Sequence, residues 1–393
     1  MKKSDIRIIQ FFNKSRNDKK LLKRFVKFHR ELYRNNPHYV PLLDYEYLGF
    51  KLLGITGFFE PDNLFYKHAE ITFFLAVDRD DQMLGRCCAF VNHRHNSHWG
   101  DRVGFFGHFE SIDDPAVAEA LINSSQEWLK EKGMDTIRGP QNLPVNEATP
   151  GLMTDGFDTR PIVYYHYNEP YYENLLIKCG LNPVKRVFSW EVPVMTPMEE
   201  KLERVANLVM KRKKVTVESW GQRSLDTRKE EMLSIYNDAW ENNFGFVPFL
   251  KEEFDKIIDD MLLVMDKNLF VFVYVDGEPA GFFGGVPNIF ECMQIGSFIS
   301  KIELLRALKV ILGAKRVKGF RFGYLGVKKK FRHMALDGVL IWYQKKYSQA
   351  RGYRYCDIGW VLDDNDIVIN TVKMMKDVKL SKTYTIFEKP ISN

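Results

Sequence analysis

"YLGVKKKFRHMALDGVLIWY" (324–343) is the stretch that decides the fold of this chain. It begins in an apolar strand, passes through a turn with three consecutive lysines and an arginine, and continues into a helix that ends at Gly352. The N-terminus of a helix offers unpaired N–H groups and the positive end of the helix dipole, and both attract phosphate. A basic turn at the start of a helix could therefore hold phosphate, and a solvated basic turn is the alternative.

The elements around this stretch occur in the same order twice along the chain. Hydrophobic periodicity predicts the series β-α-α-β-β-β-α-β-α-β in residues 1–195 and again in residues 215–393. A linker helix at 196–214 separates the two series, and a helical insertion at about 290–320 interrupts the second. We therefore expect an α/β (α+β) protein of two domains, each a mixed central sheet flanked by helices.

Some local predictions are sharper than others. Asp276-Gly277 between two apolar runs predicts a tight hairpin turn. The segment "RPIVYYH" (160–166) is expected to be a strand, and "DYEYLGFKLL" (44–53) a helix. The segment "HRHNSHWG" (93–100) is expected to be a loop, and its histidines have no accompanying carboxylate pattern, so we expect no metal site.

Composition limits the class of protein. A 393-residue chain with 45% hydrophobic and 27% charged residues is typical of a soluble protein of about two domains. Its five cysteines form no CxxC pair, and with no signal peptide they indicate reduced thiols in the cytoplasm. The net charge of +6 suits anionic small molecules or an anionic membrane surface, and nucleic acid is not expected. No G-x-S-x-G, Walker or G-x-G-x-x-G motif appears, which disfavours hydrolases, NTPases and Rossmann enzymes.

The basic turn resembles the coenzyme A loop of the GNAT acyltransferases, roughly V-x-x-x-x-R-x-x-G-x-G/A. Val327 and Arg332 match that motif, while Ala335 and Asp337 replace its two glycines. An acid beside phosphate is unfavourable, and the lysines of the turn (328–330) would have to compensate for it. This copy of the motif is therefore degenerate, and the first half of the chain has no equivalent.

Several motifs resemble a family of two-domain, GNAT-like bacterial proteins that is similar to the bacterial ceramide synthases. They are "GFFGHFE" (104–110), "RGPQN" (138–142), "GFDTRP" (156–161), "YNEPYY" (167–172) and "WVLDDN" (360–365). The resemblance implies transfer of a fatty acyl chain from a thioester to the amine of a sphingoid base. It also implies coenzyme A or acyl-CoA as a cosubstrate, with no covalently bound cofactor.

The predicted site residues follow from these matches and from what amine acylation requires: a base, an acid for the thiolate, and a polarised carbonyl. The donor would be bound by Leu325, Gly326, Val327, Arg332, His333, Met334, Ala335 and Asn365. Asn365 could equally be the N-cap of the last helix. The catalytic candidates are Glu110, Asp357 and Asp363 as bases and Tyr384 as an acid. The acceptor would be bound by Asn142, Asn146, His166, Tyr167 and Asn168, although these residues are also typical of turns.

The insertion at 290–320 is both apolar and basic, which is typical of a membrane-surface helix, of an acyl-chain flap, or of a helix that covers a sheet. We therefore expect a cytoplasmic protein, or one that is peripheral at the inner membrane. Two other functions stay open: a FemAB-like transferase that uses aminoacyl-tRNA, and a non-catalytic protein that binds acyl chains or coenzyme A. The acyl length, the acceptor, the donor-binding half and the oligomeric state stay open as well.

Overall fold

The computed structural model describes residues 5–50, 54–143, 149–211, 214–293 and 302–391, and the chain forms two compact units. Unit 1 comprises Met1–Phe188, Ile295–Arg306 and Lys382–Asn393. Unit 2 comprises Ser189–Gln294 and Ala307–Ser381. The division expected from the sequence, into 1–195, a linker at 196–214 and 215–393, stays a prediction.

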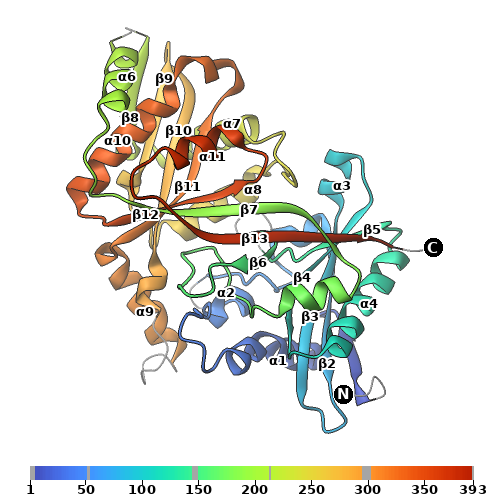
Figure 1. Cartoon of the computed structure of the whole chain (residues 1–393). Helices are drawn as coiled ribbons and strands as arrows, with labels where there is room; N and C mark the ends of the chain where they lie inside the picture. The colour runs from blue at the N-terminus through green and yellow to red at the C-terminus, as the bar shows by residue number, and fades with distance from the viewer. Residues whose placement is uncertain (1–4, 51–53, 144–148, 212–213, 294–301, 392–393) are drawn as a thin grey trace. The chain divides into compact units, whose positions relative to one another are not determined.

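Unit 1 is a mixed sheet with helices on both faces (Figure 1). Its elements are β1 (Arg7–Phe11), α1 (Arg16–Leu32), α2 (Asp44–Leu48), β2 (Ala69–Val77), β3 (Met83–Asn92), α3 (His93–Trp99), β4 (Val103–Ser111), α4 (Pro115–Glu131), β5 (Thr136–Gly139), β6 (Leu152–Asp155) and α5 (Tyr172–Lys178). The strand order is β1-β2-β3-β4-β5, and only β4 and β5 among these neighbours run parallel.

The core of unit 1 follows from alternation along its strands. In β2, Phe74 and Ala76 face the cluster formed with α4, while Phe73 and Leu75 face the cluster formed with α1. Both faces are therefore buried, which is why this strand is a continuous apolar run. The helix α4 begins as its sequence predicts, because the Asp114 side chain accepts a hydrogen bond from the Ala116 amide and a proline follows it.

Unit 2 repeats this arrangement (Figure 1). Its elements are α6 (Glu200–Met210), β8 (Val215–Ser219), α7 (Leu225–Ala239), α8 (Lys251–Met261), β9 (Phe270–Val275), β10 (Glu278–Pro287), β11 (Gly319–Val327), α10 (Leu336–Arg351), β12 (Tyr355–Leu362) and α11 (Asp366–Lys373). The helix α9 (Glu303–Gly313) begins in unit 1 and belongs to unit 2 from Ala307 onward. The strand order is β12-β11-β10-β9-β8, with β11 and β12 parallel. The hairpin prediction is confirmed, because Asp276 and Gly277 both have positive φ, at 51° and 81°.

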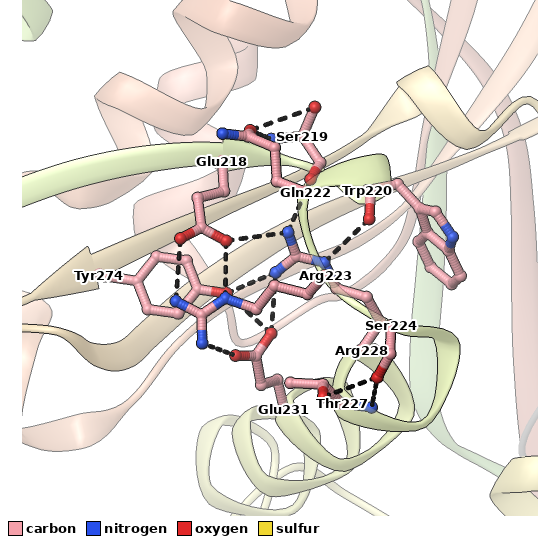
Figure 2. Close-up of polar contacts among 10 residues, drawn as sticks. All are labelled: Glu218, Ser219, Trp220, Gln222, Arg223, Ser224, Thr227, Arg228, Glu231 and Tyr274. Carbon is pink, nitrogen blue, oxygen red and sulfur yellow. Dashed lines mark hydrogen bonds and ion pairs between the residues drawn. The ribbon is translucent and has the colours of Figure 1, made fainter.

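A buried ion cluster joins β8, α7 and β9 of unit 2, and Figure 2 shows its contacts. Arg228 is fully buried, and all of its N–H groups have partners. These partners are the Trp220 and Ser219 carbonyls, Glu218 at 3.0 Å, Glu231 at 2.8 Å and the Tyr274 hydroxyl. Arg223 donates a second, bidentate pair of hydrogen bonds to Glu218, at 2.8 and 2.9 Å. The positive charges of Arg223 and Arg228 are therefore matched by the negative charges of Glu218 and Glu231.

The last strand of the chain pairs in unit 1. In β13 (Lys379–Pro390), residues Phe387–Pro390 pair with β5 and residues Thr383–Thr385 pair with β6. Conversely, the end of β7 (Asn182–Pro193) belongs to unit 2, where β7 neighbours β12 and the Ser189 hydroxyl donates to Asp357. The mixed α/β fold is confirmed, while the first half has a helix, α3, and a strand, β6, that the predicted order lacks. Residues Asn182–Phe188 of β7 belong to unit 1, and β13 from Lys382 onward belongs to unit 1 as well.

Three local predictions are wrong. Residues 160–166 form no strand, because the chain turns at Tyr164, whose φ is +70°, and β6 takes part in the sheet instead. The segment 93–100 is not a loop but the helix α3, which Asn92 caps at its start and the left-handed Gly100 ends. The helix predicted from residue 44 ends at Leu48, because Gly49 has a φ of +68°.

Candidate functional site

The parallel strands of unit 2 separate beside the predicted donor residues. Pairing of β11 with β12 covers Gly319–Phe322, and β11 then continues to Val327. The register between β10 and β11 shifts at this point, because Gly284 faces Tyr324 and Gly285 faces Phe322, which leaves Gly323 of β11 as the extra residue of a bulge. Leu325, Gly326 and Val327 therefore lie beyond the region that pairs with β12, while they stay paired with Phe283, Phe282 and Gly281 of β10. Backbone groups of this stretch that do not bond β10 point toward the side on which β12 has separated.

Gly326 is required at its position by close packing. A Cβ atom on Gly326 would lie 2.5 Å from the Trp240 ring, so no larger residue fits without displacing that ring. Trp240 ends α7 and stacks on Tyr236 with ring centroids 4.7 Å apart. The aromatic side chains at the end of α7 therefore pack against this end of β11.

The basic turn after β11 is neutralised from within unit 2. The Lys329 amide donates to Asp238 at 2.6 Å and its ammonium pairs with Glu241, while Lys330 pairs with Glu278 at 2.6 Å. The Arg332 guanidinium donates to the Ala239 carbonyl at 2.8 Å. Such exposed pairs contribute little stability, so an anionic ligand of higher charge could replace them. His333 and Met334 complete this turn as its last residues.

The start of α10 explains the glycine that the GNAT motif requires. Ala335 is the N-cap of α10, with φ +53° and ψ 36° in the left-handed region, where glycine is favoured. No side chain caps this helix end, and Asp337 lies in its first turn. At this position an alanine therefore adopts a backbone conformation that favours the glycine of the motif.

Three further predicted residues lie on or after β12. Asp357 is buried, it is in register with Arg321 before the strands separate, and it accepts a hydrogen bond from Ser189 at 2.5 Å. Asp363 lies beyond the separation, in the turn between β12 and α11, and is half-buried. Asn365 is the N-cap of α11, and its side chain accepts from the Val368 amide at 3.3 Å.

The corresponding strands of unit 1 also separate, but a loop of unit 1 covers the exposed edge. Pairing of β4 with β5 ends at Phe105, and a bulge at His108, whose φ is +48°, follows. The Gln141 amide donates to the Phe106 carbonyl at 2.7 Å, and the Asn142 side chain accepts from the His108 amide at 2.7 Å. A Cβ on Gly107 would lie 1.9 Å from the Gln141 carbonyl oxygen, so only glycine allows this approach.

The two units therefore differ at the same point of the fold. In unit 1, β5 ends at Gly139 and the following residues fold back along β4. In unit 2, β12 ends at Leu362 and α11 begins at Asp366, which leaves room only for a short turn. Asn142 is thus a residue that closes the β4 edge, and Asn146 lies outside the described residues.

Glu110 lies in a buried polar cluster of unit 1. Its carboxylate accepts hydrogen bonds from the Tyr33 hydroxyl at 2.6 Å and the Tyr172 hydroxyl at 2.7 Å, and it lies 3.5 Å from the Arg86 guanidinium. Burial raises the pKa of the Glu110 carboxyl, which Arg86 and the two hydroxyls oppose. Sequence reasoning missed these three partners. The signal was Arg86 itself, because a charge inside the apolar run "MLGRCCAFV" (83–91) indicates a buried ion pair.

The remaining predicted residues of unit 1 make internal contacts. Asn168 bonds both the amide and the carbonyl of Met153, at 2.7 and 3.0 Å, and so holds the edge of β6. The Tyr167 hydroxyl donates to the Phe157 carbonyl at 3.1 Å. The buried Tyr384 donates to the His166 carbonyl at 2.8 Å, and burial lowers the pKa of His166 to about 4. These residues lie close together, while their roles toward an acceptor stay predictions.

Two proteins of known name are similar to nearly the whole chain. The protein YghO of Escherichia coli (strain K12) is 27% identical over 397 residues, which cover 97% of this chain and 94% of that protein. The bacterial ceramide synthase of Caulobacter vibrioides (strain NA1000 / CB15N) is 29% identical over 382 residues, which cover 94% of this chain and 95% of that protein. No protein-family model matches the sequence.

Solved structures confirm the fold. A tandem GNAT protein from the clavulanic acid biosynthesis pathway matches with a TM-score of 0.57 at 9% identity, over 99% of both chains. The glucosamine N-acetyltransferase region of a fungal multi-domain GH3 enzyme matches with a TM-score of 0.54 at 12% identity, over 98% of this chain and 38% of that one. The fold is that of two GNAT-like α/β domains in tandem.

Proposed function

We propose that this tandem GNAT-like chain is an N-acyltransferase that moves an acyl group from a thioester, acyl-CoA or an acyl-carrier protein, to an amine. The observation that carries this proposal is the end of the β11–β12 pairing at Phe322, after which β11 continues into a basic turn and a helix N-terminus. The similarity to a bacterial ceramide synthase makes a long-chain sphingoid base the first acceptor to test. A coenzyme A donor places the reaction in the cytoplasm.

Unit 2 is the unit that we assign to the donor. The backbone groups of residues 325–327 would hydrogen-bond the pantetheine arm and polarise the thioester carbonyl. The cations of the turn, with the free amides at the start of α10, would hold the phosphates of coenzyme A. Unit 1 is less suited to the donor, because residues 141–143 already occupy the same edge there.

Among the predicted bases, position favours Asp363. It lies past the point where β11 and β12 separate, whereas Asp357 lies in the paired region and accepts a short hydrogen bond from Ser189. The Glu110 carboxylate is already bound by two hydroxyls and a guanidinium. Asp363 would accept the proton that the amine loses as it attacks the thioester.

The test is an assay of the full chain with palmitoyl-CoA and sphinganine. Thiol release measures the rate, and mass spectrometry identifies the amide product. We expect amine-dependent thiol release, and a fall in kcat of ~100-fold for Asp363→Asn, because general base catalysis contributes 10²–10⁴-fold. Asp366→Asn, at the exposed start of α11, is the control. Thiol release at the background rate with every acyl-CoA, acyl-carrier protein and amine would overturn the proposal. Binding of the acyl-CoA without turnover would then indicate a non-catalytic protein. A reaction that depends on aminoacyl-tRNA would indicate a FemAB-like transferase.

The assignment of unit 2 to the donor has its own test. Arg332→Gln should raise KM for palmitoyl-CoA about tenfold, which corresponds to the loss of one charge-assisted hydrogen bond to phosphate. It should leave KM unchanged for the N-acetylcysteamine thioester of palmitate, which has no phosphate. Equal effects on both donors would show that the turn supports the fold and does not bind phosphate.

A further inference from the structure

The helix α9 exposes its apolar face. The aliphatic side chains on its outer side are Leu304, Leu305, Leu308, Ile311 and Leu312. They recur with the period of a helix, so they form one continuous stripe. Each is between 37% and 73% exposed, with Leu312 the most exposed. An apolar stripe of this kind on the solvent side of a helix marks a surface that binds something.

The charges at the start of the same helix are turned inward. Glu303 pairs with Arg306 at 2.6 Å and with Arg30 at 2.8 Å, and Arg306 also donates to the Pro41 carbonyl at 2.7 Å. Arg306 is only 7% exposed. The first turn of α9, Glu303–Arg306, belongs to unit 1, and its charged side chains are held there by polar contacts.

Four exposed cations lie on α9 or shortly after its end. Lys309, Lys315, Arg316 and Lys318 are all exposed. The one acidic residue between positions 302 and 318 is Glu303, which its two arginine partners neutralise. The surface thus combines aliphatic side chains with positive charge. It complements a layer of anionic groups that covers an apolar interior.

We propose that the outer face of α9 binds the surface of an anionic lipid bilayer, with the five aliphatic side chains inserted and the cations at the headgroups. A protein partner fits less well, because protein interfaces concentrate their binding energy in Trp, Tyr and Arg at the centre, and this stripe is wholly aliphatic. No helix within the described residues is long and apolar enough to cross a bilayer. This inference does not depend on the proposed acyl transfer.

Vesicle flotation tests the proposal directly. The full chain should float with vesicles that contain phosphatidylglycerol and bind phosphatidylcholine vesicles more weakly, with the difference decreasing as salt screens the charges. The double variant Leu308→Ser with Leu312→Ser should lower the partition coefficient at least tenfold, because two leucine side chains would no longer bury apolar area in the bilayer. Leu208→Ser with Leu263→Ser is the matched control, because those leucines are 54% and 60% exposed on other elements.

Flotation that is lost in the α9 variant and kept in the control supports the proposal, and so does weaker binding to anionic vesicles after Lys315→Gln with Arg316→Gln. Equal flotation of the wild type and the α9 variant would overturn it. A dimer that dissociates in the α9 variant, or binding of an acidic carrier protein without vesicle binding, would also overturn it and identify a protein occupant. Circular dichroism checks that every variant is folded.

Discussion

His29 is a buried imidazole of unit 1 for which the described residues provide no hydrogen-bond partner at either ring nitrogen. Burial, and then the positive charge of Arg86, hold the pKa of His29 well below its ordinary value of about 6.5. Below about pH 6.5 His29 binds a proton in the unfolded chain but not in the folded chain, so the free energy of unfolding falls as the pH falls. The ring packs beside Tyr39 and Tyr47, with centroids 5.7 and 6.0 Å away, and a phenyl ring fits the same environment.

We therefore expect His29→Phe to stabilise unit 1, with a gain that grows below about pH 6.5 and reaches ~2 kcal/mol near pH 5 from proton linkage alone. Urea unfolding of both proteins at several pH values measures this difference. His38→Phe is the comparison, since His38 lies on the surface side of the same region. A difference in stability that does not change with pH would show that His29 is protonated in the folded chain.

At the scale of an element, Asn365 shows how one contact can serve two interpretations. As an N-cap, the Asn365 side chain accepts a hydrogen bond from the Val368 amide at 3.3 Å. As a ligand, the same side chain would also contact the pantetheine arm of the donor. Asn365→Ala should cost ~1 kcal/mol and fray α11, whereas Asn365→Ser should restore the cap. If both variants keep the wild-type KM for acyl-CoA, Asn365 is a cap alone. A KM that rises in Asn365→Ser, while its thermal unfolding matches the wild type, would show a ligand contact.

The sequence predicted elements whose signals are local and missed contacts between distant segments. The Asp276-Gly277 turn, the Asp114 cap and the basic turn before α10 are all visible in a few neighbouring residues. The covering of β4 by Gln141 and Asn142 is not, because it joins Asn142 to His108, 34 residues earlier in the chain, and needs a glycine at position 107. The burial of Arg228 was missed for a related reason: its partners lie on β8, β9 and α7, and a helix pattern alone treats an arginine as exposed.

At the scale of the whole molecule, the pairing of the last strand, β13, with β5 and β6 is the feature that periodicity could not predict. The stretch "KLSKTYTIFEK" (379–389) reads as a strand whichever sheet it joins. Its placement is decided by its partners, with Phe387 paired to Gly139 and buried in the same core cluster as α4. The stability of unit 1 should therefore depend on residues at the far end of the sequence.

Phe387→Ala tests this dependence. Phe387 is fully buried against a core that includes Leu121 and Trp128 of α4, so its truncation should destabilise unit 1 by ~3–5 kcal/mol. Hydrogen exchange measured by mass spectrometry should show faster exchange in peptides of α4 and little change in the β9–β10 hairpin of unit 2. Leu380→Ala, on the same strand but 50% exposed, should leave both unchanged. Faster exchange in the β9–β10 hairpin, with α4 unaffected, would mean that β13 stabilises the half of the chain in which it is encoded, and the sequential domain division would then hold.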